Sequence, residues 1–192
     1  MMHSSKLHKM VGIAVLAAIG FVLMNFAIPI IPAFPFLTLD LSDLVILLAV
    51  LLYGVSGGVE VALIRTLLHF VITGASVVTL IGDTAAFLAS VAFMLPLALL
   101  VKDNYNWRRA LTGIVFGTIA LTLVMSLLNY FVLMPMYVTA LGFKLNVSLG
   151  AYVLTGVVPF NLIKGVIVGA VFLVVARMLN WWLARNRQQL TH

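Results

Sequence analysis

The segment LTGVVPFNLIKGVIVGAVFLVVARMLN (154–180) decides the fold, because two polar residues lie well inside an otherwise apolar run. Such a run is long enough for one helix to cross a bilayer, which takes about 20 residues. On a helix, Asn161 and Lys164 are three residues apart and share one face. A charge at that depth faces a protein interior or a wet cavity. Lys164 therefore either pairs with a carboxylate of the chain or binds a ligand. The second role must be considered, because the chain has only five carboxylates.

The composition defines the class of protein. The chain has 192 residues, of which 64% are hydrophobic and 8% charged, and its mean hydropathy is +1.23. These values indicate an integral membrane protein with one transmembrane domain over residues 1–192. The net charge of +6 does not indicate a nucleic-acid partner, because the cations cluster beside apolar segments that contact lipid. The absence of cysteine excludes disulfides and thiolate metal sites.

The apolar pattern predicts an all-α bundle of six transmembrane helices. The second and third are short for a span, so one re-entrant hairpin is the alternative; two spans are the favoured interpretation. A connection with three prolines, at positions 29, 32 and 35, separates the first two helices. The expected helices cover approximately residues 9–29, 43–54, 58–73, 83–101, 110–134 and 154–180.

The distribution of charge predicts the orientation. With six spans, most cations fall on one side of the membrane, while Lys144 lies on the other. The side that is rich in lysine and arginine is the cytoplasmic one. We therefore expect a multi-pass protein of the cell membrane with both termini in the cytoplasm. The cations on the expected cytoplasmic side are Lys6, Lys9, Lys102, Arg108, Arg109, Arg177, Arg185 and Arg187.

Two asparagines are candidates for one ligand site. Asn129 and Asn161 lie in the outer halves of consecutive antiparallel helices and can converge. An amide offers donors and an acceptor together, so two amides and the Lys164 ammonium suit a planar ligand edge with alternating carbonyl and N–H groups. The alternative role of the asparagines is to form hydrogen bonds between helices. Residues near Asn129 that are candidates to pack a flat ring are Tyr130, Phe131, Met134, Met136 and Tyr137. For each of them singly, contact with lipid or a place in the core is the favoured interpretation.

A second polar set lies on the expected third helix. Arg65 and His69 share a face at four-residue spacing, and Glu60 precedes them. The set is consistent with a small intramembrane enzyme, but a structural polar network is the favoured interpretation. A metal site is not predicted, since His69 is the only intramembrane histidine. The chain has no GxxxxGK[ST] phosphate loop, so active transport would take its energy from an ion gradient or a partner.

Small residues recur at four-residue spacing on three of the expected helices. Such pairs let another helix approach closely. Most serve packing inside the bundle, and one is a candidate docking face for a partner membrane protein. The pairs are Ala14 with Ala18, Gly113 with Gly117, and Gly165 with Gly169.

Three motifs together resemble a known family: NYFVLMPMY (129–137), PFNLIKG (159–165) and LTLDLSD (37–43). The chain resembles the riboflavin-specific substrate-binding subunit, or S component, of energy-coupling factor (ECF) transporters over nearly its whole length. The resemblance implies a six-helix bundle that binds riboflavin with high affinity from outside. It also implies partners, namely a transmembrane scaffold subunit and two cytoplasmic ATPases that supply the energy.

The resemblance also implies roles for single residues. Asn129, Asn161 and Lys164 would hold the edge of the isoalloxazine ring. Asp83 stands where the family has a Gly-Glu stretch and would contact the ribityl chain. The candidate lid consists of Leu37, Thr38, Leu39 and Asp40, and the candidate docking residues are Ala14 and Ala18.

Three alternatives to riboflavin binding stay open at the level of sequence. The first is an S component for another vitamin, such as thiamin or pantothenate. The second is the intramembrane enzyme that would use Glu60, Arg65 and His69. The third is a structural or assembly subunit without a ligand.

Overall fold

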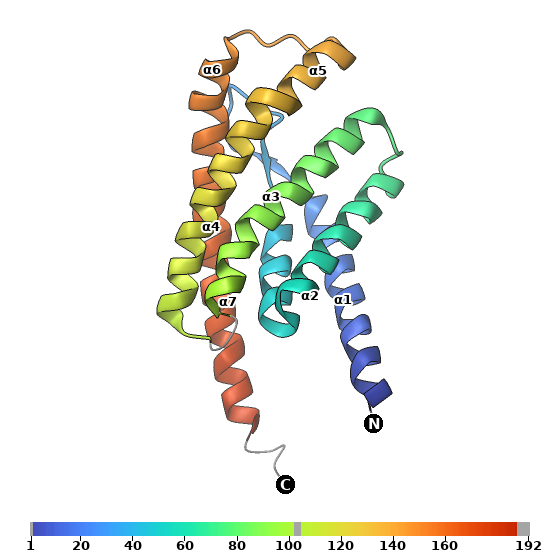
Figure 1. Ribbon diagram of the computed structural model, residues 1–192, viewed down its shortest axis with the longest axis vertical. Coiled ribbons are helices and arrows are strands. Elements are labelled where there is room, and N and C mark those ends of the chain that lie inside the picture. The colour runs from blue at the N-terminus through green and yellow to red at the C-terminus, as the bar shows by residue number, and fades with distance from the viewer. Residues whose placement is uncertain (1, 102–104, 188–192) are drawn as a thin grey trace.

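The computed structural model describes residues 2–101 and 105–187, so Lys102 lies outside the described residues. Within them the chain is almost entirely helical, with both ends of the chain at one end of the bundle (Figure 1). The helices are α1 (Met2–Met24), α2 (Ser42–Ile72), α3 (Val77–Val101), α4 (Trp107–Leu128), α5 (Met134–Leu141), α6 (Leu149–Tyr152) and α7 (Val158–Arg187).

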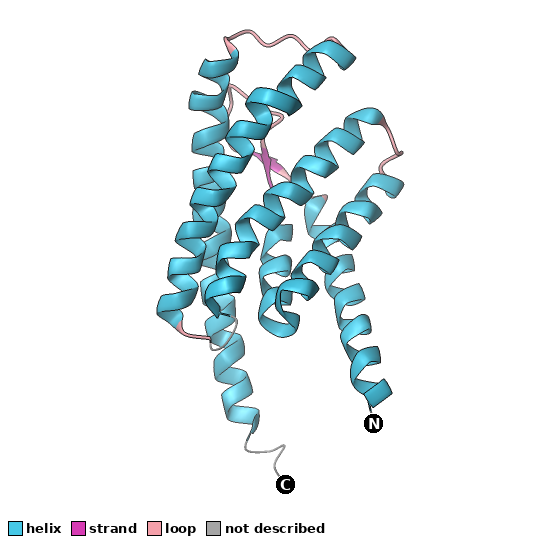
Figure 2. Cartoon of the chain, in the orientation of Figure 1, coloured by secondary structure: helices cyan, strands magenta, loops and turns pink. Residues whose placement is uncertain are grey.

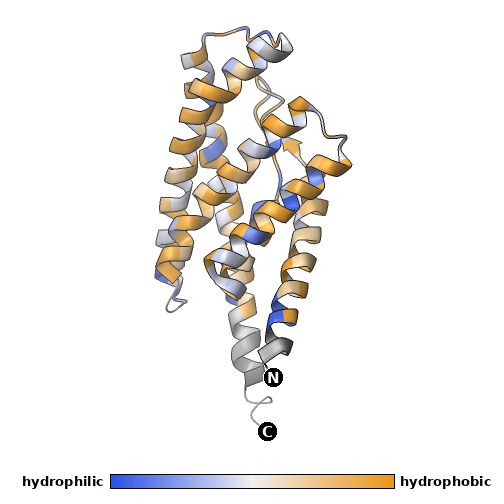
Figure 3. Ribbon diagram, turned by 45° about the vertical axis from the view of Figure 1, so that its right-hand side comes forward, coloured by the Kyte–Doolittle hydropathy of each residue, from blue (hydrophilic) through white to orange (hydrophobic). Residues whose placement is uncertain are grey.

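Two π-helical turns join some of these helices into longer rods. The turn η1 (Asn129–Leu133) connects α4 to α5, and η2 (Val153–Val157) connects α6 to α7. Five stretches of the described chain are long and apolar enough to cross a membrane. Apolar residues cover most of the length of these helices, as an environment of lipid requires (Figure 3). The five stretches are Lys6–Met24, Ser42–Ile72, Val77–Val101, Trp107–Thr139 and Leu149–Leu179.

The helix α2 is interrupted at Gly54. This glycine has φ 76° and ψ −169°, which is outside the helical region, and the chain turns back there (Figure 1). Glycine adopts positive φ without the steric cost that a Cβ would add. The predicted helices 43–54 and 58–73 are thus the two arms of α2, on either side of this break.

Several helix bounds differ from those predicted by the apolar pattern. The first helix ends at Met24 rather than near residue 29, because residues 28–29 form the strand β1 (Ile28–Pro29). It pairs antiparallel with β2 (Thr38–Leu39), so the proline-rich connection contains a small two-stranded ladder (Figure 2). The predicted fifth helix does not end near residue 134, since η1 carries it past Pro135 into α5.

The bundle packs through close contacts at small residues. A Cβ added at Gly117 would lie 2.4 Å from the backbone oxygen of Phe93 in α3, and one at Gly113 would lie 2.7 Å from the Cα of Leu97. On α7, Gly165 faces Thr118 in the same close manner. The glycine pairs of α4 and α7 therefore pack inside the bundle, where they set the approach of neighbouring helices.

Replacing Gly117 by alanine should destabilise the protein. The added methyl group would clash with backbone, and overpacking of this kind costs about 1–3 kcal/mol. Gly150→Ala is the matched control, because a Cβ there meets nothing within 4 Å. Thermal unfolding in detergent should show a lower midpoint for Gly117→Ala alone. Equal midpoints for the two variants would contradict the close α3–α4 contact.

Candidate ligand-binding site

Lys164 has a partner carboxylate. Its Nζ lies 2.8 Å from Oδ2 of Asp43, at the start of α2. The other oxygen of Asp43, Oδ1, lies 3.2 Å from an amino nitrogen (NH1) of Arg65. The three side chains are buried, with exposed fractions of 2% for Asp43, 1% for Arg65 and 9% for Lys164. Buried charges require such pairing, because leaving water costs each of them several kcal/mol. We call these three residues the ion cluster.

Hydroxyl groups complete the ion cluster. Ser90 of α3 donates to Asp43 Oδ1 at 2.5 Å, and Arg65 donates to Ser42 Oγ at 2.5 Å and to Ser90 Oγ at 2.9 Å. The Ser42 hydroxyl in turn donates to Asp40, and so does the Ser42 backbone N–H. The cluster therefore ties both arms of α2 to α3 and α7, and connects them to the segment before α2.

The predicted set of Glu60, Arg65 and His69 does not form one site. Glu60 is exposed and Arg65 binds Asp43. The Nδ1 atom of His69 lies 2.7 Å from Oδ1 of Asp83, which is itself 3% exposed. Two residues that share a helix face thus pair with different carboxylates, and the polar-network interpretation describes them better than an acid–base site does.

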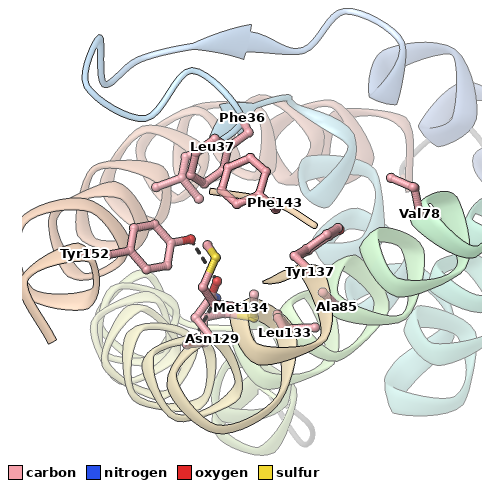
Figure 4. Close-up of a pocket in the computed structure, with 11 residues that line it drawn as sticks. Phe36, Leu37, Val78, Ala85, Asn129, Leu133, Met134, Tyr137, Phe143 and Tyr152 are labelled. Carbon is pink, nitrogen blue, oxygen red and sulfur yellow. Dashed lines mark hydrogen bonds between the residues drawn. The ribbon is translucent and has the colours of Figure 1, made fainter. Parts of the chain in front are cut away.

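A cavity of about 490 Å³ is lined in part by residues of α5 and α6. These two helices lie at the end of the bundle away from the start of α1 (Figure 1). The size of the cavity falls within the range of small-molecule sites, roughly 300–1,000 Å³. Its wall is mostly apolar and aromatic, with Asn129 and two tyrosines as the polar groups (Figure 4). The lining residues are Phe36, Leu37, Val78, Ala85, Met125, Asn129, Leu133, Met134, Tyr137, Phe143 and Tyr152.

The Asn129 amide is held in place at the cavity wall. Tyr152 donates its hydroxyl hydrogen to Asn129 Oδ1 at 2.9 Å, and Asn129 Nδ2 donates to the backbone oxygen of Met125 at 2.8 Å. Asn129 begins η1, and Tyr152 immediately precedes η2. The two residues come from the two rods, and their hydrogen bond is drawn in Figure 4. Sequence reasoning missed Tyr152, since it belongs to none of the motifs.

The candidate lid contributes only in part to the cavity wall. Phe36 and Leu37 line the cavity, whereas Thr38 and Leu39 form β2, and Asp40 binds Ser42. The ring of Phe36 packs against Phe143 and Tyr152, with centroid distances of 5.4 and 5.8 Å. Aromatic pairs at such distances are attractive. At the cavity the connection thus contributes Leu37 of the candidate lid and the neighbouring aromatic residue Phe36.

The remaining candidate residues fall into two groups. Of the predicted ring-packing residues, Met134 and Tyr137 line the cavity. The other three, Tyr130, Phe131 and Met136, are more than 40% exposed and do not line the cavity, which agrees with the favoured role of contact with lipid. Asn161, Lys164 and Asp83 are buried but do not line the cavity in this structure. Asn161 Nδ2 donates to the backbone oxygen of Val157 at 2.8 Å.

The alanine pair of α1 lies on the outside of the bundle. Ala14 and Ala18 are exposed, whereas the preceding residues Ile13 and Ala17 are buried against the bundle. The pair therefore differs from the glycine pairs of α4 and α7, which contact neighbouring helices. Its small side chains do not serve packing within this chain.

Comparison with known proteins establishes the family. Residues 8–176 match the family model described as the substrate-specific component of ECF transporters. The chain therefore belongs to this family of membrane transport components. A solved structure, described as the S component of a bacterial ECF transporter, superposes with a TM-score of 0.79 at 35% identity and covers 93% of this chain and 98% of its own.

Curated relatives agree with this assignment. The riboflavin transporter FmnP of Bacillus subtilis is 34% identical over 97% of this chain and 100% of its own length. The riboflavin transporter RibU of Staphylococcus aureus is 37% identical over 92% of this chain and 93% of its own. The relatives are transporters, so this chain is a transport component and not an enzyme.

The Tyr152–Asn129 bond can be tested with a matched pair of variants. Tyr152→Phe keeps the ring but leaves a buried amide oxygen without its donor, which costs about 1–3 kcal/mol. Tyr130→Phe is the control, since Tyr130 is 42% exposed. Thermal unfolding without ligand should give a lower midpoint for Tyr152→Phe only. An unchanged midpoint for this variant would show that the bond does not hold the two rods together.

Proposed function

We propose that the chain is the riboflavin-binding subunit of an ECF-type vitamin uptake transporter and captures riboflavin from outside the cell. The observation that carries the proposal is the cavity beside Asn129, in a chain whose relatives are named riboflavin transporters. Its apolar and aromatic wall suits a flat, largely apolar ring system, and its few polar groups suit the polar edge of that ring. The alternatives with thiamin or pantothenate have no comparable support.

The ligand would bind through Asn129, Asn161 and Lys164. The isoalloxazine edge presents carbonyl oxygens and an N–H group, for which two amides and an ammonium are complementary. In the present structure Asn129 Oδ1 accepts a hydrogen bond from the Tyr152 hydroxyl. A bound flavin would share or replace this hydrogen bond. Asp83 is the candidate partner of the ribityl hydroxyl groups, since its Oδ2 is buried without a hydrogen bond in the described part of the chain.

The segment from Leu37 to Asp40 is the proposed lid. Within it, Thr38 and Leu39 form one strand of the ladder with residues 28–29, and Asp40 binds Ser42 next to the ion cluster. A ladder of two residue pairs is short enough to open without unfolding the bundle. Opening would expose the cavity to the outside, and closing would cover the flavin with Phe36 and Leu37.

Energy for uptake would come from partner subunits. The chain has no phosphate loop, and we infer that it works with a transmembrane scaffold and two cytoplasmic ATPases. Ala14 and Ala18 are the proposed docking residues, since both are exposed on α1 and their small side chains let a scaffold helix approach closely.

The proposed topology has six spans, with the two arms of α2 crossing separately and both termini in the cytoplasm of a cell-membrane protein. The break at Gly54 supports two arms, and the shared end of the termini supports a common side. Lys144 lies in the connection between α5 and α6, at the opposite end. The excess of cations around the termini then marks the cytoplasmic side.

The purified protein should bind one riboflavin with nanomolar affinity, which corresponds to roughly −12 kcal/mol. Quenching of flavin fluorescence on titration measures the affinity, and thiamin and pantothenate should not compete. Lys164→Met should weaken binding at least about tenfold, since unpaired buried polar atoms of the ligand cost about 1–3 kcal/mol each. Lys144→Met, at an exposed lysine, is the control. No quenching at micromolar riboflavin would overturn the proposed function.

Cysteine labelling tests the topology, because the chain has no cysteine of its own. In Lys144→Cys, a membrane-impermeant thiol reagent should label intact cells. In Lys6→Cys it should label only after permeabilisation, because residue 6 is expected in the cytoplasm. The reverse pattern would invert the proposed orientation.

Replacing an alanine of the Ala14–Ala18 pair by a bulky residue should abolish uptake but leave riboflavin binding intact. In Ala14→Trp the bulky side chain would hold a scaffold helix away, while the proposed ligand residues on other helices stay intact. We expect normal riboflavin binding by the purified variant and loss of uptake in cells. Val115→Trp, at an exposed position of α4, is the control and should keep both. Parallel loss of binding and uptake in Ala14→Trp would assign the pair to folding instead.

A further inference from the structure

We infer that Asp43 positions Lys164 for the ligand, and that Ser90 and Arg65 fix Asp43 in turn. The inference rests on the proposed function, because it concerns how the proposed riboflavin site is held together. It assigns a role to a carboxylate that is remote from both asparagine motifs. Asp43 would act through Lys164 and would not itself touch the flavin.

The Lys164 ammonium is only partly used by the protein. An ammonium has three N–H donors. Within the described residues, Lys164 Nζ contacts Oδ2 of Asp43 at 2.8 Å. Two donors thus remain for a ligand. A lysine side chain is a flexible four-carbon stem, so one anchored donor restricts the directions of the other two.

The Asp43 carboxylate is fixed from the other side. Its Oδ1 accepts from the Ser90 hydroxyl at 2.5 Å and from Arg65 at 3.2 Å, while Oδ2 faces Lys164. These partners come from α3, the second arm of α2, and α7. A carboxylate held by hydrogen bonds and charges from three elements has little freedom to move. The position of the Lys164 ammonium is therefore fixed by residues on helices of the bundle rather than by a loop.

The negative charge of Asp43 also matters. Arg65 and Lys164 are both buried cations beside it, and like charges repel strongly where water is excluded. A neutral residue at position 43 would leave the two cations facing each other without a counter-ion between them. Lys164 would then turn away from Arg65, and its remaining donors would no longer point to the ligand.

A double-mutant cycle on riboflavin affinity tests the inference. The proteins are the unmodified chain, Asp43→Asn, Lys164→Met and the double variant, each titrated with riboflavin in detergent. If Asp43 acts through Lys164, Asp43→Asn weakens binding at least about tenfold alone, but less than about threefold in the Lys164→Met background. Glu60→Gln, which neutralises an exposed carboxylate, is the control and should leave the affinity unchanged.

A milder variant covers the case in which Asp43→Asn does not fold. Ser90→Ala removes one donor to Asp43 but keeps every charge, so it should weaken binding about two- to fivefold and only when Lys164 is present. Ser126→Ala is its control, since that buried hydroxyl has no hydrogen-bond partner in the described part of the chain.

The outcomes separate the two proposals. Losses at position 43 or 90 that are equal with and without Lys164 would overturn the positioning role and leave the riboflavin function standing. No binding by the unmodified chain would overturn the proposed function, and the positioning role with it. Coupling in both cycles supports the inference.

Discussion

The rest of the structure depends on one buried carboxylate, Asp43, between the two cations Arg65 and Lys164. A lone charge in this position would be expensive, because protein and lipid replace the water around it. Two cations and one carboxylate, with the Ser42 and Ser90 hydroxyls, satisfy one another instead. The consequence is geometric, since both arms of α2 must stay in register with α3 and α7 for the cluster to close.

This constraint explains how a nearly apolar chain can carry a polar site. Many exposed residues of the helices are large and apolar, and glycines such as Gly117 and Gly165 let neighbouring helices approach closely. Several polar residues, among them Asp43, Arg65, Asn129 and Lys164, are buried in the interior instead. There the η1 turn presents Asn129 to the cavity, and Tyr152 holds its amide.

The sequence predicts much of this architecture. Apolar runs indicate the membrane helices, and the predicted end of a helix near residue 54 coincides with the break that the structure places at Gly54. The partner of Lys164 could not be predicted, because Asp43 is far away in the sequence and only the packing of α2 against α7 brings them together. Helical spacing places Arg65 and His69 on one face but does not reveal their partners, which lie on the other arm of α2 and on α3. The π-helical turns have no comparable signal in the sequence.

The most direct test of the account is an experimental structure of the protein with riboflavin bound. The isoalloxazine edge should lie within hydrogen-bond distance of Asn129, Asn161 and Lys164, with the Lys164–Asp43 contact preserved. The ring would lie in the cavity between Tyr137, Met134 and Phe143. A flavin bound elsewhere, or a bound flavin that Lys164 does not touch, would contradict the account.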